Sequence, residues 1–213
     1  MADIMRSRKH SSLAVKLILA ASAVVHAISI AIQIYYFNLF GSTVGIPQLI
    51  SYGVLFLVEV LPAGLAFVGA VIEEGRSERG NVPLALACLY VSISSLYGLA
   101  LSFKNGVTVL NWSYIVCQAV ISAVYIFAAV DGFRAFKLLN VSRVLGAIPI
   151  LVGVVRLCSS GQSILDRLVF SPEMLVGLAV VQTWGMLAEL LFYVAVFVFL
   201  IVNAKPVHDK NAA

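Results

Sequence analysis

Three ionisable residues lie near the middle of long apolar runs: His26, Glu59 and Glu189. Acidic and basic side chains at the centre of a bilayer cost about 2.5–3.5 kcal/mol on insertion scales, so they usually face other protein groups or water. Desolvation favours the protonated form of a buried glutamate, and proton-coupled transport uses the exchange of that proton. The two glutamates therefore favour a solute or proton path, with structural hydrogen bonding as the alternative for all three residues.

Further polar residues form stripes along the same runs. At three- and four-residue spacings or their multiples, the stripes are Ser22, His26, Ser29 and Gln33; Tyr90, Ser94 and Tyr97; Tyr114, Gln118, Ser122 and Tyr125; and Gln182, Glu189 and Tyr193. Lipid cannot satisfy polar groups, so we expect these stripes to converge inside a bundle. Gln33, Gln118 and Gln182 are therefore candidates for lining the path. Interhelical hydrogen bonds of about 0.6 kcal/mol each explain the serines and tyrosines without any function.

Pro62 lies three residues after Glu59 and predicts a helix kink beside that acid. Proline removes a backbone hydrogen bond and bends a helix, and broken helices beside buried acids occur where binding cavities form. Proline is also commoner in membrane helices than in soluble ones, which explains it without a cavity.

Composition shows what surrounds these residues. The chain has 213 residues, of which 62% are hydrophobic and 11% charged, against about 45–50% and 25% in a soluble domain. Only a lipid bilayer can cover that much apolar surface. The net charge of +4 comes from short segments between apolar runs and not from a basic patch with aromatics, so no nucleic acid partner is predicted. No catalytic motif, metal-ligand spacing or cofactor pattern is present, and none of these is predicted.

The predicted fold is an all-α, polytopic transmembrane bundle of about six spans. The spans lie near residues 17–40, 49–72, 82–103, 109–130, 141–158 and 174–202, within a bundle from 13 to 205, between a basic tail at 1–12 and a short tail at 206–213. Most approach the roughly 20 residues that cross a hydrocarbon core. The segment 141–158 has a shorter apolar centre and fits a re-entrant or interfacial segment as easily as a full span. Residues 164–170 suggest a separate interfacial helix.

Basic residues predict how the bundle is oriented. Six spans place both termini and most of the lysines and arginines on the inner side, as the positive-inside rule requires. Arg143 and Arg156 flank the apolar centre of 141–158 and are expected to reach the two interfaces. Asp131 begins a sequence that faintly resembles the CDP-alcohol phosphotransferase motif but lacks its other aspartates. With Arg134 and Lys137 it is therefore interpreted as a charged helix end at the inner surface.

Small residues at four-residue spacing form a further face, made of Ala23, Ala27 and Ala31. Such residues permit close helix approach, and most of them serve internal packing. This ladder is similar to the alanine ladder in the first helix of vitamin-binding S-components of energy-coupling transporters, which are also six-helix proteins. The similarity rests on three alanines and implies a possible docking face for other membrane subunits.

Three functions are compatible with the sequence. The first is a small transporter or channel-like bundle whose interior exchanges protons. The second is a non-catalytic structural or assembly subunit of a larger membrane complex, since little mass lies outside the apolar runs. The third is an intramembrane lipid-modifying enzyme using glutamate and histidine as acid and base. It ranks last, and an enzyme is not the favoured interpretation, because no nucleophile accompanies these groups.

Overall fold

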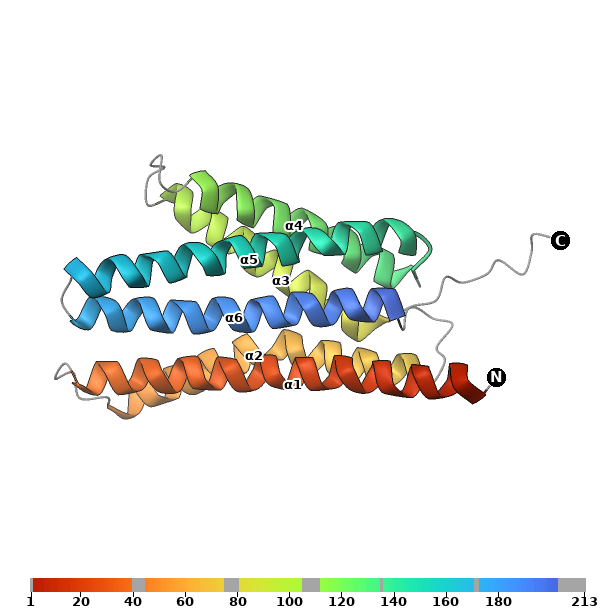
Figure 1. Ribbon diagram of the computed structural model, residues 1–213, viewed down its shortest axis with the longest axis horizontal. Coiled ribbons are helices and arrows are strands. Elements are labelled where there is room, and N and C mark those ends of the chain that lie inside the picture. Colours follow the sequence, from red (N-terminus) through yellow and green to blue (C-terminus); the bar gives the residue numbers. More distant parts are fainter. Residues whose placement is uncertain are drawn as a thin grey trace.

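The computed structural model is an all-α bundle, which confirms the predicted fold class (Figure 1). It describes residues 2–39, 45–74, 81–104, 112–134, 136–170 and 173–202, apart from some side chains within these ranges. The helices are α1 (Ala2–Leu39), α2 (Ile46–Glu74), α3 (Val82–Lys104), α4 (Trp112–Phe133), α5 (Leu139–Phe170) and α6 (Glu173–Val202).

The described helices are long and apolar enough for a multi-pass membrane protein. Five apolar segments of 20 residues or more occur among the described residues: Leu13–Ile32, Val82–Lys104, Trp112–Phe133, Leu139–Ser159 and Thr183–Val202. A shorter apolar segment, Val60–Ile72, lies in α2. Helices are the expected form of such segments, because each satisfies its own backbone hydrogen bonds without help from the lipid.

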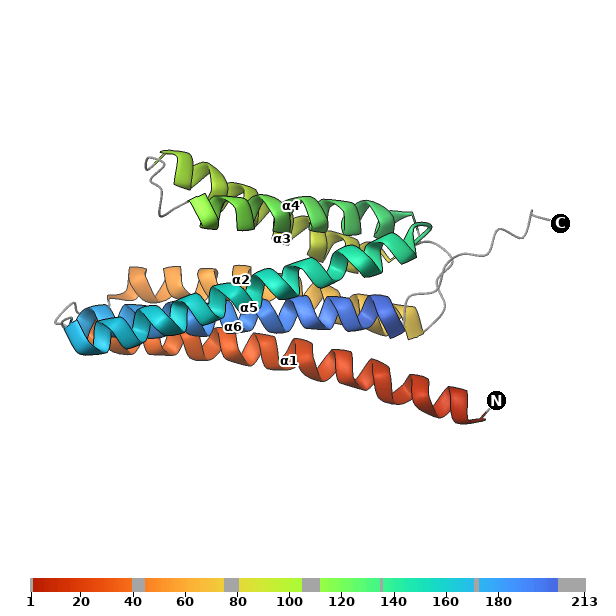
Figure 2. The ribbon, with the colours of Figure 1, turned by 45° about the horizontal axis from the view of Figure 1, so that its top comes forward.

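The helices are arranged in two groups that join near the end where the chain termini lie. Figure 2 shows α3 and α4 as a pair set apart from α1, α2, α5 and α6, closest to them at the end that holds the N-terminus. Helix α6 packs mainly against α1 and α5, and α3 packs mainly against α4. Hydrogen bonds support both pairings: Ser22 donates to the Ala188 carbonyl at 2.8 Å, and the hydroxyls of Ser92 and Ser122 lie 2.9 Å apart.

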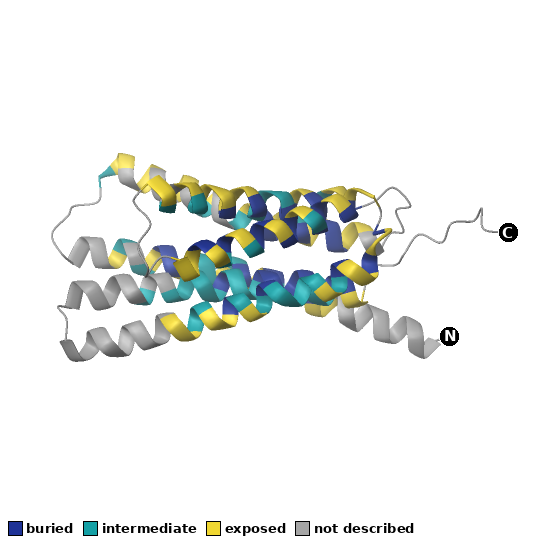
Figure 3. Ribbon diagram, turned by 90° about the horizontal axis from the view of Figure 1, so that it is seen from above, coloured by how far each residue is buried: buried dark blue, intermediate teal, exposed yellow. Residues whose placement is uncertain are grey.

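The apolar core lies between α1, α2, α3, α4 and α6, and buried residues line the inward faces of the helices (Figure 3). Leu19, Ala66, Val196 and Phe199 belong to it, and each is at most 4% exposed. Small side chains at Ala66 and Ala70 allow the helices to approach closely, which is how membrane helices pack without a hydrophobic driving force.

Three features differ from the sequence prediction. Helix α1 begins at Ala2 and so includes residues of the basic tail, and α5 continues to Phe170 without a separate interfacial helix. The predicted stripe on α3 is wrong, because Tyr97 is 66% exposed and Ser94 is exposed. The buried polar residues are Ser92 and Ser95 instead, since small side chains fit the close contact with α4.

Candidate functional site

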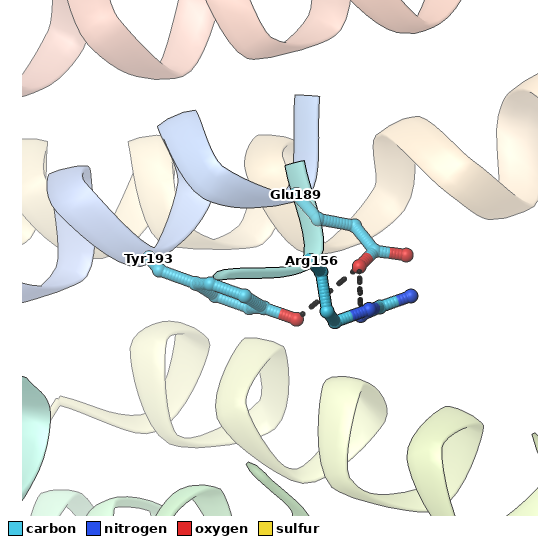
Figure 4. Close-up of polar contacts among 3 residues, drawn as sticks. All are labelled: Arg156, Glu189 and Tyr193. Atoms are coloured by element: carbon cyan, nitrogen blue, oxygen red, sulfur yellow. Dashed lines mark hydrogen bonds and ion pairs between the residues drawn. The ribbon is translucent and has the colours of Figure 1, made fainter. Parts of the chain in front are cut away.

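The predicted residue Glu189 belongs to a polar cluster built by three helices, and Figure 4 shows its members from α5 and α6. Its Oε2 accepts a hydrogen bond from Arg156 Nη1 of α5 at 2.9 Å, and the Tyr193 hydroxyl of α6 lies 3.4 Å from the same oxygen. The Arg156 guanidinium also lies over the ring of Tyr114 of α4, 5.7 Å from its centroid. Opposite charges within membrane helices are expected to pair in this way.

The close approach of α5 and α6 positions the ion pair. A Cβ at Gly153 would lie 3.0 Å from Leu190 Cδ1 and 3.4 Å from Tyr193 Cδ2, so the absence of a side chain lets the two helices meet. Arg156 lies three residues after Gly153 and therefore on the same face of α5. On the other side of α6, the Ser22 bond to the Ala188 carbonyl holds α1 beside the residue that precedes Glu189.

Aromatic residues of α4 and α6 complete the surroundings. The ring of Tyr193 lies 5.6 Å from the ring of Tyr125, which is 3% exposed. Tyr114 reaches toward α3, where its hydroxyl would lie 3.2 Å from a Cβ at Gly98. The cluster therefore sits where the α3–α4 pair faces α5 and α6.

The two charged side chains differ in accessibility. The Arg156 side chain is 14% exposed and that of Glu189 is 43% exposed, so the carboxylate forms the open side of the pair. Arg156 Nε is buried, and no acceptor among the described residues lies within hydrogen-bonding distance of it. A buried donor without an acceptor is unusual in folded proteins.

The structure places some of the predicted site residues, and the side chains of others lie outside the described part. Gln118 is 7% exposed and lies one turn from Tyr114 on α4, whereas His26 is half-buried on the face of α1 that carries Ser22. The side chains of Glu59, Gln33 and Gln182 lie outside the described part of the structure.

Helix α2 is continuous through Pro62, whose side chain is buried. The kink predicted at this proline stays a prediction.

The two arginines expected at the membrane interfaces both have protein partners. Arg156 pairs with Glu189, a contact that the sequence interpretation missed. The sequence did contain a signal for this contact, because an acidic residue inside one membrane span is expected to pair with an opposite charge from another span. Arg143 donates from Nε to the Leu200 carbonyl at 2.7 Å and from Nη2 to the Ile201 carbonyl at 3.2 Å. It thereby caps the C-terminal end of α6, where carbonyls lack helical partners.

Asp131 is not a surface charge, contrary to the sequence prediction. It is 1% exposed, accepts the Leu138 backbone N–H at 2.7 Å and accepts the hydroxyl of Ser142. The carboxylate holds the turn from α4 into α5, which explains an acid at this position without catalysis. Arg134 and Lys137 are exposed, as predicted for a helix end.

The predicted docking face of Ala23, Ala27 and Ala31 is partly exposed. Ala27 and Ala31 are exposed and Ala23 is half-buried, while Ala66 and Ala70 of α2 are in the core. Exposure of alanines is equally expected for a lipid-facing surface, so docking of another subunit stays a prediction.

Chemically, the cluster offers a fixed positive charge, an accessible carboxyl group that can exchange a proton, and phenol groups that can donate or accept hydrogen bonds. Among the described residues, no three His, Cys, Asp or Glu side chains gather to form a metal site. Comparisons with protein-family models, curated proteins and solved structures give no match to this chain.

Proposed function

We propose that this protein is a small proton-coupled transporter in which Glu189 is the proton-exchanging group and Arg156 is its counter-charge. The observation that carries the proposal is the Arg156–Glu189 ion pair between two apolar helices, in which the Glu189 side chain is 43% exposed. Ionisable residues inside membrane helices are rare and mark ion or proton paths. A purely structural pair has no need of an accessible carboxylate.

Protonation of Glu189 supplies the switch that such a transporter needs. The charged carboxylate holds Arg156 of α5 against α6, whereas the neutral acid removes the electrostatic part of that contact. The loss of this ion pair then shifts the equilibrium between two arrangements of α5 against α6. Gln118 and His26 belong to the proposed path, together with Glu59, Gln33 and Gln182.

Proton flux into proteoliposomes tests this proposal. Purified protein is reconstituted with a pH-sensitive dye inside, and an inward pH gradient drives proton entry. The native chain is expected to acidify the interior faster than protein-free vesicles. Glu189→Gln, which keeps size and hydrogen bonding but cannot exchange a proton, is expected to reduce entry to the level of protein-free vesicles.

The control variant is Arg143→Gln, which removes an arginine from the same helix at a position far from Glu189. It is expected to keep the native rate once its folding is verified by gel filtration. Equal proton entry through the native chain and through Glu189→Gln would exclude the proposal. Absence of flux together with stoichiometric co-purifying proteins would favour a structural subunit of a membrane complex instead.

A further inference from the structure

The guanidinium group of Arg156 has more hydrogen-bonding capacity than its protein partners use. A guanidinium carries five N–H donors in a planar fork that matches the two oxygens of a carboxylate or phosphate. Its contact with Glu189 is through Nη1 alone, and its Nε is buried without an acceptor among the described residues. The pair is therefore not the bidentate arrangement that arginine and a carboxylate commonly form.

From this geometry we infer that Arg156 is the binding site for an oxyanion, a carboxylate or phosphate group, and that Glu189 competes with it for the guanidinium. The inference rests on the proposed function and names the class of solute. When Glu189 is charged, the pair is neutral; when Glu189 is protonated, Arg156 has an uncompensated positive charge. One proton on Glu189 thus permits one negative charge at Arg156.

The surroundings of the pair favour an oxyanion over a cation. The guanidinium lies over the ring of Tyr114, and the Tyr193 hydroxyl beside Glu189 Oε2 offers a further donor. Further titratable groups on the packed helices include Tyr125 on α4, whose ring lies 5.6 Å from that of Tyr193, and His26 on α1, one turn from Ser22. Among the described side chains of α2, none is titratable. Arginine is thus the only one of these partners that is always charged.

The position of the pair along the helices leaves two sources for the anion. Arg156 lies three residues before the end of the apolar segment Leu139–Ser159, and Glu189 lies near the middle of α6 (Glu173–Val202). A dissolved anion and a lipid headgroup both carry oxygens that pair with a guanidinium.

Binding of sulfate and succinate to the purified full-length protein in neutral detergent tests this inference. Sulfate keeps its charge across mildly acidic and alkaline pH, so any pH dependence belongs to the protein. Anion binding is measured by the rise in unfolding temperature at constant ionic strength. The native chain is expected to bind more tightly at acidic pH, and Arg156→Gln is expected to abolish the effect.

Glu189→Gln gives the decisive result, because a gain of affinity cannot come from misfolding. Removing the competing carboxylate is expected to raise the affinity at alkaline pH by about tenfold and to remove the pH dependence. Arg143→Gln, whose arginine binds α6 carbonyls, is expected to behave as the native chain. Equal binding by the native chain and Arg156→Gln, or no gain in Glu189→Gln with either anion, would overturn the inference.

Nanodiscs distinguish the two sources of the anion. If dissolved anions have no effect, but phosphatidylglycerol in phosphatidylcholine nanodiscs stabilises the native chain and not Arg156→Gln, the ligand is a lipid headgroup. If neither probe acts through Arg156, the inference is wrong. Anion binding without proton flux would exclude the transport proposal but keep Arg156 as an anion site. Proton flux that depends on Glu189, without anion binding that depends on Arg156, would support transport and exclude the anion site.

Discussion

Arg143 and Arg156 are the same residue type on one helix, yet they act on α6 in different ways. Arg143 donates to the carbonyls of Leu200 and Ile201, which lie in the last turn of α6. A positive charge is favoured there by the helix dipole and by the unpaired carbonyls. Arg156 instead meets the Glu189 carboxylate, so one arginine fixes a helix end and the other neutralises an internal charge.

The buried carboxylate of Asp131 gives a prediction at the level of one residue. Asp131→Ala would leave the Leu138 N–H and the Ser142 hydroxyl without their acceptor. Hydrogen bonds to a charged group contribute about 1.5–3 kcal/mol each, so we expect the loss of both to cost about 3 kcal/mol or more. Reversible unfolding in mixed detergent micelles, followed by circular dichroism, measures the change.

The control for this prediction is Lys137→Ala, which removes an exposed charge close to the same turn. It is expected to change the stability by less than about 0.5 kcal/mol. A similarly small effect of Asp131→Ala would show that the carboxylate does not hold the turn.

At the level of helices, Asn81 joins the ends of α2, α3 and α4. Its side-chain oxygen accepts the Leu84 N–H at 3.1 Å and so caps α3, while its amide donates to the Gly69 carbonyl of α2 at 2.9 Å. Its backbone N–H donates to the Gly132 carbonyl of α4 at 3.0 Å. Glycine at 132 is required for this approach, because a Cβ there would lie 3.2 Å from that of Ala85.

Asn81→Ala is therefore expected to destabilise the bundle at this junction. Loss of the cap costs about 1 kcal/mol, and the Gly69 carbonyl also loses a donor. Asn81→Ser keeps a capping oxygen and loses the bond to Gly69, so its effect should be smaller. Hydrogen exchange at the first turn of α3 measures both variants, and equal exchange rates in all three proteins would contradict the assignment.

Sequence predicted the helices well, because each long apolar run must form one in lipid. The partners of individual polar residues were harder to predict. Arg156 and Glu189 are 33 residues apart, and their contact depends on the register of α5 against α6 at Gly153. The buried face of α3 was also missed, since a tyrosine stripe is as compatible with lipid contact as with a polar interior.

At the level of the whole molecule, α5 determines how many times the chain crosses the bilayer. Its apolar segment runs from Leu139 to Ser159 in one uninterrupted helix with Pro149 inside. Twenty-one residues of helix are about 30 Å long, which matches the hydrocarbon core. This length favours a full crossing over the re-entrant alternative.

Thiol labelling tests that crossing. Cys158 is exposed near one end of this segment, and Lys137 is exposed just before the other. With Cys88 and Cys117 replaced by alanine, Cys158 and a cysteine introduced by Lys137→Cys are expected to react with a membrane-impermeant maleimide from opposite sides. Reaction of both from the same side would show that α5 does not cross the membrane.

The contact between α1 and α6 can form only after α6 has been synthesised. Ser22 and Ala188 are hydrogen-bonded across 166 residues of sequence, so α1 is synthesised well before its partner emerges. Until then α1 has α2 as a packing partner, but not the carbonyl that accepts the Ser22 hydroxyl. A chain that stalls before α6 therefore lacks the acceptors of both the Ser22 hydroxyl and the Arg156 guanidinium.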